Sequence, residues 1–199
     1  QLRPEHQVLV LEMGIRHPGD IAELCAIARP HVAVITGIGV AHLESMGSVE
    51  AIADEKASLL DHLQPGGTAI LPSDDPWFAF LERRAPGRVI SVCADEHHEA
   101  ARQATLHATG LAFGTDGTSF RVVEADGTAS PVTLRLLGRH HVLNTLLAAG
   151  VATVFGIRMR TALRSAARMP AVPHRLSIRE ESGIRILDDA FNSNPVGAA

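Results

Sequence analysis

Lysine is almost absent from this sequence. The chain has 18 lysine and arginine residues in total, and Lys56 is the only lysine among them. Arginine stays protonated, whereas a lysine removed from water can lose its proton, act as a nucleophile or accept carbon dioxide as a carbamate. Lys56 is therefore a candidate for chemistry that arginine cannot perform. The alternative is a lysine whose stem packs on apolar surface while its amine reaches water.

Other features are scarce as well, and each scarcity argues against a class of protein. The two cysteines, Cys25 and Cys93, lack CxxC spacing, which favours buried thiols in a reducing cytoplasm. No apolar run approaches the roughly 18 residues of a membrane span, and no signal peptide opens the chain, so a cytoplasmic protein is expected. The formal net charge of −4 argues against a mainly electrostatic nucleic-acid or membrane binder.

Several catalytic signatures are missing too. No GxxxxGK[ST] phosphate loop occurs, and Gly37-Ile38-Gly39 does not open a GxGxxG motif because His42 takes the place of the third glycine. The 11 histidines lack the paired spacing of a zinc site. No GxSxG or Cys-His signature supports covalent hydrolysis. The sequence as given therefore shows no evident phosphate cradle.

Alternating strand and helix patterns predict an α/β fold, with a mostly parallel sheet covered by helices on both faces. Continuous apolar runs predict strands buried on both faces. The predicted strands are 8–11, 32–35, 68–71 and 88–92, and the predicted helices between them are 18–28, 48–63 and 76–84.

The pattern changes in the second half of the chain. From 104 to 137, short alternating segments separated by Asp-Gly dipeptides predict a small antiparallel sheet attached to the parallel one. A strongly apolar helix is expected at 139–155 and a second helix at 161–168, followed by a linker at 169–173. Beyond it, 175–187 is typical of a hairpin that delivers Asp188 and Asp189.

The helix that carries Lys56 is the centre of the predicted architecture. Ser48 can cap its start, and Pro65-Gly66-Gly67 follows its end. Steps of three and four residues from Val49 place Lys56 on the stripe that faces the core.

Polar side chains follow the predicted parallel strands, at the edge where open sheets bind ligands. Glu12 follows the first strand, His42 lies in the loop after the second, and Ser73-Asp74-Asp75 follows the third. With a carboxylated Lys56, Glu12 and His42 would supply ligands suited to magnesium or manganese. The alternative is that Glu12 is a cap or ion-pair partner and that His42 is an ordinary polar loop residue.

Two further polar groups are open to more than one interpretation. His140-His141 can cap a helix or contact a ligand, and Asn144 lies one turn further along an otherwise apolar helix. The loop 188–195, with sequence DDAFNSNP, can bind a sugar hydroxyl or merely form Asx turns, and the residues alone favour the turns.

Six short motifs in this order resemble those of the Mur ligases, and the resemblance spans nearly the whole chain. They are Glu12-Met13-Gly14; Ala41-His42-Leu43-Glu44 with Gly47-Ser48; Glu55-Lys56-Ala57; Gly138-Arg139-His140 with Asn144; His174-Arg175-Leu176; and the 188–195 loop.

The resemblance implies an ATP-dependent amide-bond ligase, of the acid–amino-acid type, in peptidoglycan precursor synthesis and so in cell wall biogenesis. Its motifs are most similar to those of the members that join D-alanyl-D-alanine to a UDP-N-acetylmuramoyl-tripeptide through an acyl phosphate. The implied partners are these two substrates, and a monomer is expected. Another member acting on a different carboxylate or amine is an alternative, and so is a non-catalytic module that keeps the fold.

The resemblance also implies a domain division. Residues 1–172 would form an N-terminally incomplete central ATP-binding domain in a P-loop-like fold, and 173–199 the beginning of the C-terminal ligase domain. The family's phosphate loop would lie before Gln1, so this polypeptide alone is expected to be inactive.

The site residues implied by the resemblance fall into two groups. Glu12, His42 and a carbamylated Lys56 would bind Mg²⁺, with His42 and Lys56 as the catalytic candidates. Asn144, His141, Arg175 and Asp189 would contact ATP. The sequence departs from the family pattern at His141 and Gly37, where asparagine is usual or common, and at Phe191, where tyrosine is expected.

Overall fold

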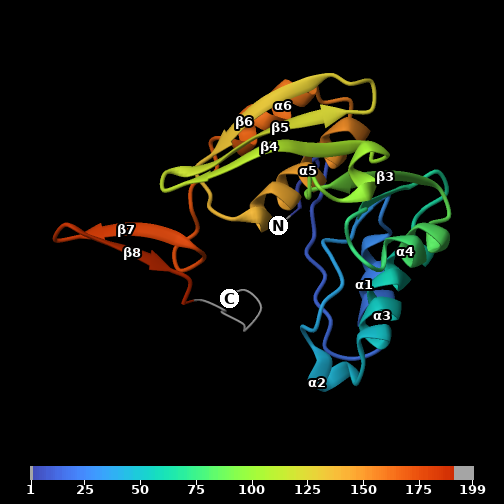
Figure 1. The fold of residues 1–199 in the computed structure, drawn as a ribbon. Helices are drawn as coiled ribbons and strands as arrows, with labels where there is room; N and C mark the ends of the chain where they lie inside the picture. Colours follow the sequence, from blue (N-terminus) through green and yellow to red (C-terminus); the bar gives the residue numbers. More distant parts are fainter. Residues whose placement is uncertain (1, 191–199) are drawn as a thin grey trace.

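The computed structural model of the chain is built on a six-stranded sheet (Figure 1) and describes residues 2–190, with Arg179 described by its backbone alone. The strands lie side by side in the order in which they occur in the sequence. They are β1 (Val32–Val34), β2 (Thr68–Pro72), β3 (Arg88–Cys93), β4 (Leu106–Gly114), β5 (Gly117–Glu124) and β6 (Ala129–Leu134).

The first four strands pair in parallel and the last two pairings are antiparallel. In the parallel part, Ile70 of β2 is the register partner of Val34 in β1 and of Ile90 in β3. The antiparallel part is a continuation of the same sheet, joined through the parallel pairing of β3 with β4. The structure therefore confirms the mostly parallel sheet with a small antiparallel extension.

Helices cover both faces of this sheet, as the alternating pattern predicts. The α-helices are α1 (Asp20–Ala28), α2 (Leu43–Met46), α3 (Val49–Asp61), α4 (Phe78–Arg84), α5 (Arg139–Val154) and α6 (Met159–Ala166), and one 3-10 helix is η1 (Glu99–Arg102). Helix α5 packs against β2, β3 and β4, while α3 and α4 share a hydrophobic cluster on the opposite face. The apolar periodicity of the sequence does not predict the short helices α2 and η1.

Strand β2 shows why a continuous apolar run is needed at the centre of the sheet. Successive side chains of a strand point to opposite faces. Ile70 therefore belongs to the core under α5, whereas Ala69 and Leu71 belong to the core under α3 and α4. In α5, Gly150 allows close packing, since a Cβ there would lie 3.0 Å from the Ile70 side chain.

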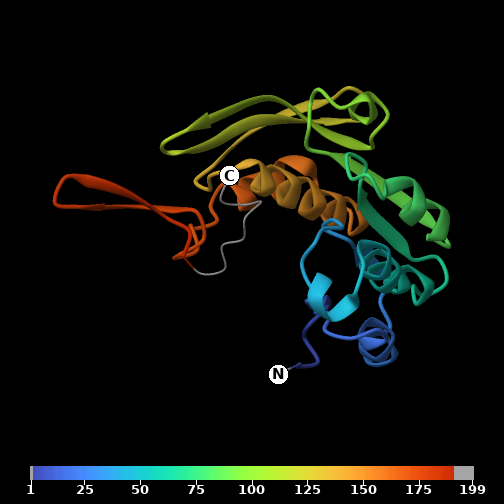
Figure 2. The same ribbon diagram turned by 60° about the horizontal axis from the view of Figure 1, so that its bottom comes forward.

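A separate two-stranded antiparallel sheet ends the described chain. It consists of β7 (Ser177–Glu181) and β8 (Ile184–Asp188). The turn between them uses positive φ angles at Ser182 (52°) and Gly183 (77°). Figures 1 and 2 show this hairpin projecting away from the six-stranded sheet. The hairpin predicted at the C-terminal end is thus confirmed.

The apolar run 8–11 does not form the buried strand that its sequence predicts. Val8, Leu9, Val10 and Leu11 are exposed, from 49% for Val8 to 85% for Val10, and the segment has no regular secondary structure. An apolar run becomes a strand only when a neighbouring strand satisfies its backbone groups. Among the described residues no strand pairs with it, and β1 is the edge of the sheet on that side.

The two thiols are free and buried, as expected from their surroundings. Burial and the Asp74 carboxylate raise the pKa of the Cys93 thiol to about 11, and burial raises the pKa of Cys25. Both thiols are therefore protonated and poor nucleophiles at neutral pH. In the part of the chain that the structure describes, no helix has the length and apolarity that crossing a bilayer requires.

A buried carboxylate on α3 fixes the beginning of α1. Glu55 is only 8% exposed, and its two oxygens accept hydrogen bonds of 2.8 Å from the backbone N–H groups of Gly19 and Ile21. These N–H groups have no partner within α1, because the first turn of a helix lacks preceding carbonyls. A carboxylate is also favoured there by the helix dipole. Helical periodicity predicts the apolar stripe of α3 but does not identify this contact.

We expect Glu55→Gln to lower the free energy of unfolding by about 2 kcal/mol, because an amide NH₂ would face one of the two N–H donors. Denaturant unfolding of the purified protein measures this change. Asp54→Asn is the matched control. Asp54 is the residue before Glu55, so the variant removes one negative charge from the same helix, but this carboxylate forms only an exposed ion pair with Arg84. Its expected cost is below about 1 kcal/mol. Equal costs for the two variants would contradict the role assigned to Glu55.

Candidate active site

The side chain of Lys56 reaches from α3 to the loop after β1. Its amine donates a hydrogen bond of 2.6 Å to the backbone carbonyl of Gly37, and the residue is half-buried. Ser48 caps α3 as predicted, accepting from the N–H of Ala51 at 3.1 Å. The structure therefore confirms both the helix and the inward direction of its single lysine, with the amine bonded to backbone and not fully in water.

Asp75 connects the loop after β2 to the same place. Its Oδ2 accepts from the N–H of Ile38 at 2.8 Å, and its Oδ1 accepts from the N–H of Trp77 at 2.8 Å. Gly37 has a φ of 147°, and a Cβ there would lie 3.3 Å from the Asp75 carboxylate. The glycine thus allows the two loops to approach. The position of Asp75 after a strand signals this edge of the sheet, but the sequence alone does not reveal its contacts.

The environment of Lys56 changes its acid–base behaviour. Burial lowers the pKa of the Lys56 ammonium, and the nearby Asp75 carboxylate opposes part of this shift. A lowered pKa increases the fraction of neutral amine at neutral pH. The neutral amine is the form that reacts with an electrophile such as carbon dioxide.

Glu12 and His42, the other predicted metal ligands, are exposed. Glu12 lies in the segment without regular structure that precedes α1, whereas His42 is the residue before α2 and has a φ of 71°. In residues 2–190, no cluster of three or more His, Cys, Asp or Glu side chains could hold a metal ion. The geometry therefore presents Lys56 as a preorganised group, with Glu12 and His42 on accessible surface.

A second polar group lies at the beginning of α5. The rings of His140 and His141 have centroids 4.1 Å apart at an angle of 47°, and Asn144 is exposed one turn further along. Within the helix, Thr145 donates a hydrogen bond of 2.7 Å to the carbonyl of His141. This arrangement leaves the Asn144 amide accessible to a ligand.

The chain between the linker and β7 comes back to this end of α5. Leu176 lies so close to Gly138 that a Cβ on the glycine would come within 2.9 Å of it. Asp189 accepts a hydrogen bond of 3.0 Å from the N–H of Leu176, and its charge acts on His140. Arg175 precedes Leu176 and is exposed. The fold therefore gathers residues from distant parts of the sequence at the N-terminus of α5.

Asp188 has a local structural role. It lies 2.8 Å from the His174 ring and accepts from the N–H of Ala190 at 3.2 Å, which is an Asx turn. The Asx-turn interpretation is thus confirmed at Asp188. Phe191 and the remainder of the 188–195 loop lie outside the described residues.

The two histidines at the start of α5 resist protonation. Burial, together with the adjacent His140, lowers the pKa of His141 to about 4. Burial also lowers the pKa of His140, although the Asp189 carboxylate opposes that shift. Both rings are consequently neutral at pH 7 and can accept as well as donate hydrogen bonds.

Comparisons with known proteins converge on one family. Residues 1–152 match the model of the Mur ligase middle domain. The UDP-N-acetylmuramoyl-tripeptide–D-alanyl-D-alanine ligase of Mycobacterium tuberculosis is 33% identical over 189 residues, which cover 94% of this chain and 36% of that protein. The chain thus spans just over a third of the length of that relative.

Solved structures agree with the sequence comparison. MurF from Acinetobacter baumannii superimposes with a TM-score of 0.89 at 29% identity, over 99% of this chain and 42% of that one. MurF from Thermotoga maritima, in complex with ADP, gives a TM-score of 0.78 at 26% identity, over 93% of this chain and 41% of that one.

The lowered pKa of His141 predicts how the free energy of unfolding changes as pH falls. With a pKa of about 4 in the folded chain and 6.5 as its ordinary value, His141 takes up a proton in the unfolded chain first as pH falls. Its contribution to stability is therefore complete above about pH 6.5 and is lost as pH falls towards 4. We expect His141→Asn to lose less stability between pH 7 and pH 4 than the unaltered protein, as measured by denaturant unfolding.

Thr161→Asn, at an exposed position on α6, changes no titratable group and is the control, so it should leave the pH profile of stability unchanged. An NMR titration of the His141 ring gives an independent measurement. A midpoint close to 6.5 would show that the ring is not desolvated in the folded protein.

Proposed function

Because the chain belongs to the Mur ligase family, we propose that it supplies the ATPase core of a ligase that joins D-alanyl-D-alanine to UDP-N-acetylmuramoyl-tripeptide. The observation that carries the proposal is the single lysine, held on a Mur ligase fold by the Gly37 carbonyl at 2.6 Å. The names of the relatives support the choice of substrates. We place the reaction in the cytoplasm, in peptidoglycan precursor synthesis.

We assign residues 1–172 to the central ATP-binding domain and 173–199 to the beginning of the C-terminal ligase domain. The change from the six-stranded sheet to the separate β7–β8 hairpin supports a boundary near the linker. The closeness of Leu176 to Gly138 supports a junction between the two parts at the start of α5.

The magnesium ligands in this proposal are Glu12, His42 and a carbamate on Lys56. Carboxylate and carbamate oxygens with an imidazole nitrogen form a donor set that suits magnesium. The fit is best supported at Lys56, where burial lowers the pKa of the amine and so favours its reaction with carbon dioxide. A carbamate would put a second negative charge near Asp75, and a divalent cation would offset the repulsion between them.

Asp75 and Gly37 act as positioning residues. By accepting from the Ile38 N–H, the Asp75 carboxylate fixes the loop whose Gly37 carbonyl bonds the Lys56 amine. Gly37 lets the loop pass close to that carboxylate. The side chain of Lys56 is thus oriented before any ligand arrives, which lowers the entropy cost of binding.

Nucleotide binding is assigned to the N-terminus of α5 and to the segment that returns to it. Asn144 and His141 would contact the adenine from α5, with the neutral His141 ring in place of the usual asparagine. Arg175 and Asp189 would contact the nucleotide from the other side. The proximity of Asp189 to His140 supports placing these residues at one site.

In the proposed reaction, the carboxylate of the muramoyl-tripeptide attacks the terminal phosphate of ATP, releasing ADP and forming an acyl phosphate. The amine of D-alanyl-D-alanine then attacks the acyl carbon, forms the amide bond and expels inorganic phosphate. Bound magnesium would stabilise the negative charge that develops on the phosphate oxygens.

Phosphate release by the full-length gene product tests the proposed function. The protein is supplied with ATP, magnesium, UDP-N-acetylmuramoyl-tripeptide and D-alanyl-D-alanine, and each substrate is omitted in turn. We expect release only when both substrates are present. Release with the tripeptide but a different amine would assign another ligase activity, and no release from folded protein would identify a non-catalytic module.

Substitution of the single lysine tests the mechanism. We expect Lys56→Ala to abolish ligation while the protein remains folded, and a small carboxylic acid to restore part of the activity by replacing the carbamate. Glu50→Ala, at an exposed position on the same helix, is the control and should retain full activity. Unassisted activity in Lys56→Ala would refute the role of the carbamate.

The scarcity of lysine allows a direct observation as well. Because Lys56 is the only lysine among these 199 residues, a carbamate ¹³C signal of the 199-residue polypeptide, equilibrated with ¹³C-labelled bicarbonate, arises from Lys56 or from the terminal amine of that polypeptide. We expect this lysine signal to disappear in Lys56→Arg, which retains the charge. Persistence of the signal would assign it to the terminal amine.

A further inference from the structure

Charge is distributed unevenly along the chain. Residues 127–179 contain eight arginines and no aspartate or glutamate, although the whole chain has 22 acidic residues and a net charge of −4. Part of this basic segment is α6, which begins after Arg158 and carries Arg160 and Arg164. Such a concentration of positive charge in an acidic protein attracts negatively charged partners.

The arginines at α6 form no ion pairs with carboxylates in the described part of the chain. Arg160 and Arg164 of α6, and Arg158 just before it, are exposed, and none of the three makes an ion pair with a carboxylate among residues 2–190. By contrast, Arg84 pairs with Asp61 at 2.7 Å. The guanidinium groups of α6 therefore keep their charge and donors available for an external ligand.

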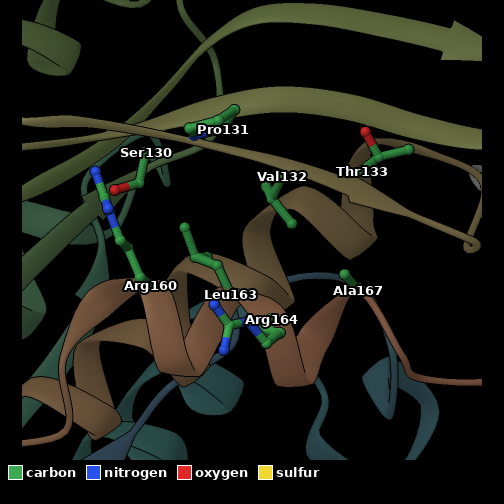
Figure 3. Close-up of a pocket in the computed structure, with 8 residues that line it drawn as sticks. All are labelled: Ser130, Pro131, Val132, Thr133, Arg160, Leu163, Arg164 and Ala167. Carbon is green, nitrogen blue, oxygen red and sulfur yellow. The ribbon is translucent and has the colours of Figure 1, made fainter.

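These arginines border a groove between α6 and the edge strand β6. Two adjoining cavities of about 450 and 490 Å³ share Ser130, Arg160 and Arg164 in their walls. Figure 3 shows Arg160 extending towards Ser130, while Leu163 and Val132 face each other across the cavity. The groove thus combines an apolar floor with a basic rim. Glu124, at one end, contributes a carboxylate to the wall of the second cavity.

A partner is not expected to bind this groove by adding a strand to the sheet at β6. β6 is an edge of the six-stranded sheet, but Pro131 in its middle lacks the N–H that an added strand would need. Recognition must therefore use the side chains of the groove.

We propose that the β6–α6 groove binds an acidic segment of another protein, with carboxylates on Arg160 and Arg164 and an apolar side chain against Val132 and Leu163 at the bottom of the groove. The concave shape and the charge of the rim are complementary to such a segment. A membrane surface is a poorer fit, because Met159 and Leu163 are almost fully covered and are reached only at the bottom of the groove, so α6 has no exposed apolar face to insert into a bilayer.

A labelled short peptide of glutamate and serine with one central leucine is a direct probe. Its binding to the full-length gene product is measured by fluorescence anisotropy at low and moderate salt. We expect binding that weakens with salt, about tenfold weaker in Arg160→Gln/Arg164→Gln. Replacing the leucine by serine should also weaken it, because the apolar floor would lose its ligand. Phosphate release should be unchanged in this double variant.

Arg88→Gln/Arg102→Gln is the matched control. It removes two exposed arginines from β3 and η1, outside the groove, and so causes the same change in net charge. Equal weakening in both double variants, or no binding by the unaltered protein, would overturn the proposal. Arginine-dependent binding to phosphatidylglycerol vesicles without peptide binding would also overturn it, in favour of a membrane ligand.

Discussion

The hydrogen bond between the Lys56 amine and the Gly37 carbonyl is the contact on which the candidate active site depends. Removing an amine from water costs free energy unless other groups replace its hydrogen bonds. Here the Gly37 carbonyl at 2.6 Å accepts a hydrogen bond from the amine, and the charge of the nearby Asp75 carboxylate favours its protonated form. Since Asp75 also accepts from Ile38, α3 and the loops after β1 and β2 are fixed to one another. A change in any one of these groups alters the orientation of the lysine.

Two neighbouring residues on α3 make contacts with different parts of the chain. Side chains one residue apart on a helix point about 100° apart, so Glu55 and Lys56 reach different parts of the chain. Glu55 turns towards the N–H groups at the start of α1, whereas Lys56 turns towards Gly37. A single turn of α3 therefore fixes both the segment that follows Glu12 and the loop that precedes His42. The stability of the fold and the preparation of the site share the same structural element.

Much of the fold could be predicted from periodicity, because strands β1–β3 and helices α3 and α5 bury apolar residues at regular intervals. The irregular structure of residues 8–11 could not be predicted in this way, since the formation of a strand depends on a neighbouring strand as well as on composition. At the candidate site, motif order and the scarcity of lysine single out Lys56, and its inward direction agrees with the helical periodicity. The roles of Glu55 and Asp75 were missed because a carboxylate that accepts backbone N–H groups leaves no periodic pattern.

The site at α5 and the groove at α6 respond differently to their surroundings because they use different basic residues. The His141 ring is uncharged at neutral pH, and its charge changes only near pH 4. The arginines of α6 stay protonated throughout that range. Salt, in contrast, screens the exposed arginines strongly and the partly buried ring weakly. The chain therefore separates exposed arginines on α6, whose charge is screened by salt, from partly buried histidine rings on α5, whose protonation is set by desolvation.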